Sequence, residues 1–249
     1  MPSDRPKAHP DPQFFATTRW SLVQKAGRHD TESADRALAE LCGLYWYPLY
    51  AYARRRGHDA EDARDLTQSF FANLLEKDRV GVADPKRGRF RTFLLSSMQN
   101  FLAGEWRKLQ ALKRGGGRDI LSLDFETAEQ SYAREPATQL DPETVFLRKW
   151  ALGLLGRAIA DLQHQYLEAG KGDLFAALKG TLDGTEPPRP YPELAGELGM
   201  SEGALRTAIS RLRSRWRERV RDIVAETVED EAQVHDELQC LIAALENSL

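Results

Sequence analysis

Apolar residues recur at steps of three and four along most of this 249-residue chain, and this spacing limits the fold more than any other feature. The first such stretch includes Leu38, Leu41, Tyr45, Leu49 and Tyr52. Pro48 is expected to bend or divide this helix. Similar stretches follow over 63–74 and 90–106, whereas the alternation of β-branched residues that marks a strand is nearly absent. The sequence therefore predicts an all-α protein.

Breaks in this periodicity predict two small helical domains joined by a flexible acidic linker. Three glycines interrupt the pattern at 115–117, and the acidic, weakly hydrophobic stretch after them is typical of a linker. Asp141, Pro142 and Glu143 then form a typical helix start, with the helix expected to run to about residue 167. The predicted parts are a disordered tail (1–16), a first domain (17–114), the linker (115–142), a second domain (143–225) and an acidic helical tail (226–249).

The charge distribution is more informative than the net charge of −3. Seven arginines lie between Ser201 and Arg221, whereas residues 222–249 carry eight acids and no lysine or arginine. A basic segment next to an acidic tail is compatible with nucleic-acid binding, which the average charge conceals. We hypothesise that the tail folds back on the basic surface, or binds a regulator, and so limits DNA binding.

Residues 191–210 (YPELAGELGMSEGALRTAIS) fit the pattern of a helix-turn-helix, which the second domain is predicted to contain. Ala195 supplies the small residue where the helices cross, Gly199 the tight turn, and Ser201 the cap of the second helix. The apolar positions are Leu194, Leu198, Met200, Leu205 and Ala208. The predicted DNA-binding residues are Ser201, Glu202, Arg206, Thr207, Ser210, Arg211 and Arg213. The alternative is an ordinary packed helix pair with a solvated basic face.

Two further stretches carry a resemblance to a known family. DAEDARDLTQSFF (59–71) and RFRTFLLSSMQNFLAGEWRK (89–108) resemble the second conserved region of bacterial RNA polymerase sigma factors of the extracytoplasmic-function (ECF) group. The helix-turn-helix is similar to the fourth region of that family, and TTRWSLV (17–23) resembles an extension found in one branch. The resemblance covers about 35–114 and 145–221 in the expected order.

The resemblance implies a function, partners and site residues. It implies a sigma factor that binds core RNA polymerase and directs initiation by recognising the minus-thirty-five and minus-ten elements of promoter DNA, with an anti-sigma factor or other regulator as a further candidate partner. The implied polymerase-binding residues are Asp62, Asp65, Leu66, Gln68 and Phe71. The implied minus-ten residues are Lys86, Arg87, Arg89, Arg91, Asn100, Trp106, Arg107 and Lys108.

Some residues of these stretches have a plainer interpretation. Apolar periodicity predicts that Phe93 and Phe101 belong to the core rather than to a DNA-stacking surface. Asp59 and Glu61 are expected to stabilise a helix start, where acids are favoured.

Other function classes find less support. A conventional helix-turn-helix repressor or activator, acting without being a polymerase subunit, is the main alternative. An enzyme is not expected because the five histidines are scattered and no HExxH, P-loop or GxSxG motif occurs. No cofactor or metal is expected.

Cys42 and Cys240 stand in no metal-binding spacing, which suits a reducing cytoplasm. A membrane span is not expected, since no apolar run approaches about 20 residues. A secretory signal is not expected either, because the start MPSDRPKAHPDP has no apolar core after its charges.

Overall fold

The computed structural model describes residues 32–76, 89–111, 125–133, 140–182, 187, 189–228 and 230–246, and every regular element among them is a helix. The elements are α2 (Glu32–Arg55), α3 (Ala60–Glu76), α4 (Phe90–Ala111), α5 (Phe125–Ala133), α6 (Pro142–Glu168), α7 (Gly172–Leu178), the 3-10 helix η3 (Lys179–Thr181), α8 (Tyr191–Glu197), α9 (Glu202–Ala225) and α10 (Glu231–Glu246). The all-α prediction is confirmed. The predicted tail (1–16) and TTRWSLV (17–23) lie outside the described residues.

Helices α2, α3 and α4 share a core rich in aromatic rings. Helix α2 continues through Pro48, so the proline does not divide it. Its Tyr45 ring meets the edge of Phe90 from α4 at 5.4 Å between centroids, while Phe70 of α3 meets Phe101 of α4 at 5.7 Å. Offset and edge-on ring pairs of this kind stabilise a core beyond the area that they bury. Phe93 and Phe101 are only partly buried, yet both pack against this core as predicted.

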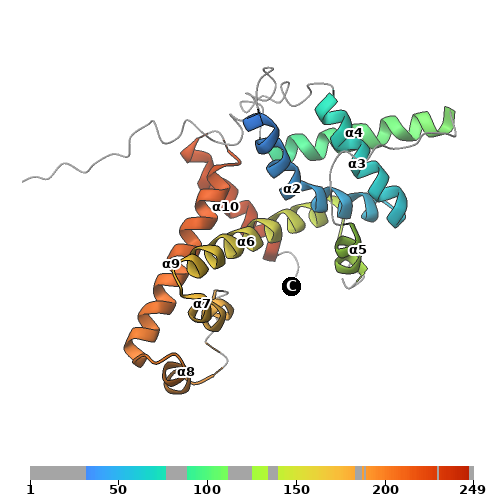
Figure 1. The fold of residues 1–249 in the computed structure, drawn as a ribbon. Helices are drawn as coiled ribbons and strands as arrows, with labels where there is room; N and C mark the ends of the chain where they lie inside the picture. The colour runs from blue at the N-terminus through green and yellow to red at the C-terminus, as the bar shows by residue number, and fades with distance from the viewer. Residues whose placement is uncertain are drawn as a thin grey trace, which may run out of the picture.

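Helix α6 belongs to two cores at once. Asp141 caps its start, since the Asp141 side chain accepts a hydrogen bond from the Thr144 backbone N–H at 2.9 Å. Near this start Trp150 is buried against α2 and its indole N–H donates to the Tyr45 hydroxyl at 3.3 Å. Near its end Leu162 and Tyr166 are buried in a second cluster formed with α7, α8 and α9. Figure 1 shows α6 running from α2 to α9.

Part of the segment predicted as a linker is a packed helix. Phe125 at the start of α5 meets the ring edges of Trp46 and Tyr50 at 5.2 and 5.6 Å. The Glu129 carboxylate accepts hydrogen bonds from Arg54 at 2.8 and 3.1 Å, and another from the Tyr50 hydroxyl. One aromatic anchor and one bidentate charge pair thus hold α5 in a segment whose composition alone predicts flexibility. The predicted domain boundaries stay a prediction.

Helix α10 completes the first core rather than extending away from it. Val234, Leu241 and Ala244 are buried in the same cluster as Phe90 and Trp150. The helix packs against α6 and α9, as Figure 1 also shows. Amphipathic spacing in the acidic tail thus corresponds to a folded-back helix. Among the described residues, no helix has the length and apolar character needed to cross a membrane.

Candidate nucleic-acid interface

Helices α8 and α9 meet at a tight turn whose geometry follows from its sequence. Gly199 adopts φ +63°, a left-handed conformation that glycine accepts without strain. The Met200 backbone N–H donates to the Ala195 carbonyl at 3.0 Å, closing the end of α8. Ser201 then caps α9, its hydroxyl oxygen accepting from the Ala204 backbone N–H at 3.2 Å. Helix α8 thus ends at Glu197, and α9 begins at Glu202 after the turn.

The apolar residues of this unit lock α9 in place. Ala195 and Leu205 are buried, together with Ile209, which the sequence pattern did not single out. Of the other predicted apolar positions, Leu194 is buried, and Leu198, Met200 and Ala208 are partly buried. With its apolar side fixed, α9 presents a polar side to solvent. That side carries Ser201, Glu202, Arg206, Thr207, Ser210 and Arg211, all exposed.

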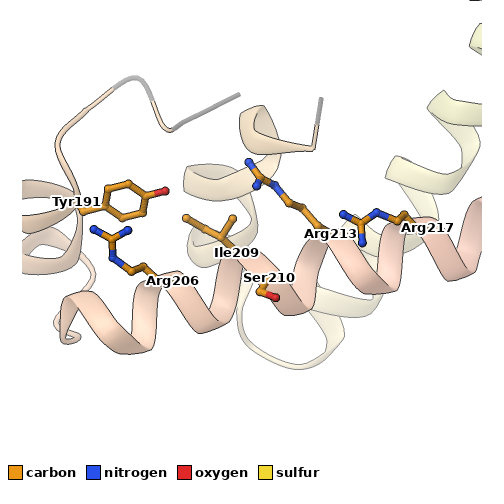
Figure 2. Close-up of a pocket in the computed structure, with 6 residues that line it drawn as sticks. All are labelled: Tyr191, Arg206, Ile209, Ser210, Arg213 and Arg217. Carbon is orange, nitrogen blue, oxygen red and sulfur yellow. The ribbon is translucent and has the colours of Figure 1, made fainter. Parts of the chain in front are cut away.

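An open hollow of about 280 Å³ lies beside this face of α9. It is lined by Tyr191, Arg206, Ile209, Ser210, Arg213 and Arg217. Figure 2 shows the arginines spaced along α9, with the Arg206 guanidinium beside the Tyr191 ring. The distance from that guanidinium carbon to the ring centroid is 4.2 Å, a cation–π contact that orients an otherwise mobile side chain. Guanidinium groups spaced along one side of a helix suit a phosphate backbone or the edge of a guanine.

Several other arginines of α9 hold the fold together. Arg213 donates to the Thr181 carbonyl at 2.8 Å and thereby fixes η3 against α9. Arg219 forms an ion pair with Asp161 of α6, and Arg221 forms one with Glu231 of α10. Arg213, which the sequence predicts to bind DNA, therefore has a structural contact as well. The exposed arginines nearest the turn remain the ones best placed for a ligand.

Two arginines lie at the start of α4, where Arg91 is buried and Arg89 is partly buried. Arg91 is 8% exposed, and its guanidinium donates to both carboxylate oxygens of Glu237 at 2.6 and 3.1 Å. Arg89 forms an ion pair with the same carboxylate at 2.8 Å and donates to the Cys240 sulfur at 2.9 Å. Burial acts to lower the pKa of Arg91, but its hydrogen bonds to Glu237 and the charge of that carboxylate raise the pKa overall.

Helix α3 carries the residues predicted to contact polymerase. Asp62 and Asp65 are exposed, and Leu66 and Gln68 are partly buried. Phe71, in contrast, is 1% exposed and belongs to the core, so its side chain supports α3 and offers no surface to a partner. The Asp62 backbone N–H donates to the Asp59 carboxylate at 2.8 Å, which confirms that Asp59 stabilises the helix start.

The comparison with protein families decides what this helical unit is. Residues 47–111, which span the end of α2, α3 and α4, match the family model described as sigma-70 region 2. Residues 47–111 therefore form a sigma-70 region 2, which supports a sigma-70 family factor. A sigma-70 region 2 supports a role in promoter recognition by RNA polymerase and implies binding to core polymerase and to promoter DNA. No curated protein and no solved structure matches the chain.

Within sigma-70 region 2, the residues predicted for the minus-ten element differ in their placement. Asn100 is exposed on α4, whereas Arg91 is buried and Arg89 is about a quarter exposed at 26%. In this arrangement Arg91 therefore presents no free surface to DNA. Lys86 and Arg87 lie outside the described residues. The helix α4 also includes Trp106, Arg107 and Lys108, whose side chains lie outside the description.

Sequence reasoning missed the partner of the buried arginines. Glu237 lies in register with Val234 and Leu241, the apolar stripe of α10, at spacings of three and four residues. An acid at a core position predicts a buried cationic partner, because an unpaired buried carboxylate is costly. That signal was present in the sequence. For metals, no group of three or more His, Cys, Asp or Glu side chains within the described ranges could hold an ion.

Proposed function

We propose that this chain is a sigma factor of the ECF group and contacts promoter DNA with two separate surfaces. The exposed face of α9 recognises the minus-thirty-five element in duplex DNA. The start of α4 and the basic residues that precede it in the sequence contact the minus-ten element as it opens. Asp62, Asp65, Leu66 and Gln68 on α3 contact core polymerase.

The observation that carries this proposal is the combination of sigma-70 region 2 at 47–111 with an oriented basic face on α9. A helix entering the major groove reads bases with the first side chains after its N-terminus. Arg206 lies one turn into α9 and is held by Tyr191, while Thr207 and Ser210 flank it on the exposed side. Arginine at such a position pairs with guanine through two hydrogen bonds.

The region 2 surface contributes a different kind of contact. Region 2 implies polymerase binding, and α3 offers two exposed carboxylates on adjacent turns, Asp62 and Asp65. These charges suit a basic partner surface, where they set orientation and the rate of association. The basic residues around the start of α4 suit the phosphates of a strand separated from its complement.

Transcription with purified bacterial core polymerase on a pool of promoter fragments tests the proposal. We expect start-site-specific transcripts that core polymerase alone does not produce. Asp65→Asn should reduce core binding, and Arg206→Ala should reduce promoter selection while leaving core binding intact. Glu61→Gln is the matched control, since it removes an exposed carboxylate from the same helix outside the proposed contact.

The proposal fails if the chain neither binds core polymerase nor directs initiation. If such a chain still binds duplex DNA, it acts as a conventional helix-turn-helix repressor or activator.

A further inference from the structure

The arginine pair at the start of α4 is already occupied, and its occupant belongs to the same chain. Glu237 is 1% exposed, and two guanidinium groups from a segment 146 or more residues away surround its carboxylate. Arg91 binds both oxygens and Arg89 binds one of them. Helix α10 therefore places Glu237 on the arginines that the proposed function assigns to promoter DNA.

A carboxylate and a phosphate make the same demands on arginine. Both accept two parallel hydrogen bonds from one guanidinium, and both carry the negative charge that it neutralises. The donors of Arg91 that bind Glu237 cannot bind a DNA phosphate at the same time. From this geometry we infer that Glu237 holds the place of a promoter phosphate, so that α10 and the DNA strand compete for Arg89 and Arg91.

The charge balance around Arg89 and Arg91 favours the replacement of Glu237 by a DNA phosphate. Two guanidinium groups face one carboxylate, and Arg89 keeps 26% of its side chain exposed beside it. The closed site thus retains a net positive charge. A polyanion approaching this edge meets an attractive potential before α10 leaves. A buried ion pair also contributes little net stability, because desolvation offsets the attraction, so replacing its anion is not prohibitive.

Other residues of α10 link the displacement of Glu237 to the position of the helix-turn-helix. Val234, Leu241 and Ala244 pack in the core that includes Trp150 of α6 and Ile223 of α9, and Arg221 of α9 pairs with Glu231. The same helix thus touches the start of α4 and the end of α9. Its release frees the two arginines and also loosens the contacts that fix α9 relative to region 2. If bound polymerase displaces α10, the proposed DNA-binding surfaces on α4 and α9 would then change together.

Binding of a labelled single-stranded DNA oligonucleotide to the full chain at low ionic strength tests the inference, which rests on the proposed role of Arg89 and Arg91. Glu237→Gln removes the competing charge and should bind roughly tenfold more tightly, because the wild-type chain must first open the site. The matched control is Asp236→Asn, which removes one exposed negative charge from the same helix and should bind as the wild type does. Adding Arg91→Gln to Glu237→Gln should abolish the gain.

The outcomes separate this inference from the proposed function. Equal affinity of wild type and a folded Glu237→Gln variant overturns the competition, while initiation by the wild-type chain with core polymerase would leave the sigma role intact. Failure of that initiation, with the gain in affinity present, would instead refute the sigma role alone. If Glu237→Gln loses its helical signal, hydrogen exchange of the wild-type chain decides. Amides of α10 should exchange faster with polymerase and promoter bound, and unchanged protection overturns the inference.

Discussion

The arginines of α9 and those at the start of α4 differ in access, although the sequence predicts DNA binding for both. On α9, Arg206 and Arg211 are exposed, and Arg206 is oriented by an aromatic ring. At the start of α4, Arg91 is buried and bound by Glu237. Composition identifies side chains that attract phosphate, whereas packing decides when those side chains are available. One surface is ready in the free chain, and the other requires α10 to move.

The largest difference between the two surfaces should appear in stability. Arg91→Ala leaves a buried carboxylate with only Arg89 as its partner, so we expect a loss of about 3 kcal/mol in the free energy of unfolding. Arg211→Ala, on the exposed surface, should change that free energy by less than about 0.5 kcal/mol. Urea unfolding of both variants measures the contrast. Equal losses would show that the burial of Arg91 contributes no more than an exposed side chain.

The opposite contrast should appear in duplex DNA binding by the free chain. Arg206→Ala should weaken binding to a cognate duplex by about 1–3 kcal/mol, the usual contribution of an arginine that pairs with guanine. Arg89→Gln should leave the same affinity unchanged, since α10 covers its surface in the free chain. Fluorescence anisotropy measures both. A larger loss for Arg89→Gln would place the duplex contact on α4 and reverse the comparison.

The turn before α9 offers a test of how the open surface is held. Gly199→Ala forces a left-handed conformation on a side chain with φ +63° and should cost about 1–2 kcal/mol of stability. Gly196→Ala is the control, because it lies within α8 and an added methyl group there meets nothing within 4 Å. That variant should be neutral or slightly stabilising. Thermal unfolding that ranks the two variants the other way would exclude the tight turn.

Helix caps on α6 and α9 should give the smallest effects, and only one should depend on pH. Asp141→Ala and Ser201→Ala should each cost about 1 kcal/mol. Hydrogen bonds from Thr144 hold the pKa of Asp141 below its usual value. The contribution of Asp141 is therefore complete above its unfolded pKa and is lost as pH falls through the lower folded value. Unfolding followed from neutral pH to pH 3 should show a pH-dependent loss for Asp141→Ala and a constant one for Ser201→Ala.

Most of the fold was predictable because apolar spacing is a local property. The helix expected from Pro142 to about residue 167 is observed as Pro142–Glu168, and helices are observed on both sides of the glycine at 199. Helix α5 was not predictable in this way. Its segment is acidic, and it is stabilised by pairing with Arg54, a residue 75 positions away. Composition cannot show whether a distant partner will neutralise such charges.

The role of the candidate site residues stays a prediction, and the sequence did not show how accessible these residues are. The arginines of both surfaces stand out in the sequence, and their environment depends on tertiary contacts. Arg91 and Glu237 lie 146 positions apart, and only the return of α10 brings them together. Glu237, an acid on the apolar stripe of α10, indicates that a cationic side chain is buried beside it. The sequence does not indicate which cationic side chain this is.

Footprinting of the complete polymerase complex on a promoter tests most directly whether α9 binds the upstream element while the start of α4 contacts the opened strand. We expect the wild-type chain to give upstream protection and permanganate-reactive thymines near the start site. Arg206→Ala should lose the upstream protection. Arg89→Gln should keep that protection and lose the permanganate reactivity, which reports strand opening. If Arg89→Gln opens the promoter as well as the wild type does, the start of α4 does not contact the opened strand and the account is contradicted.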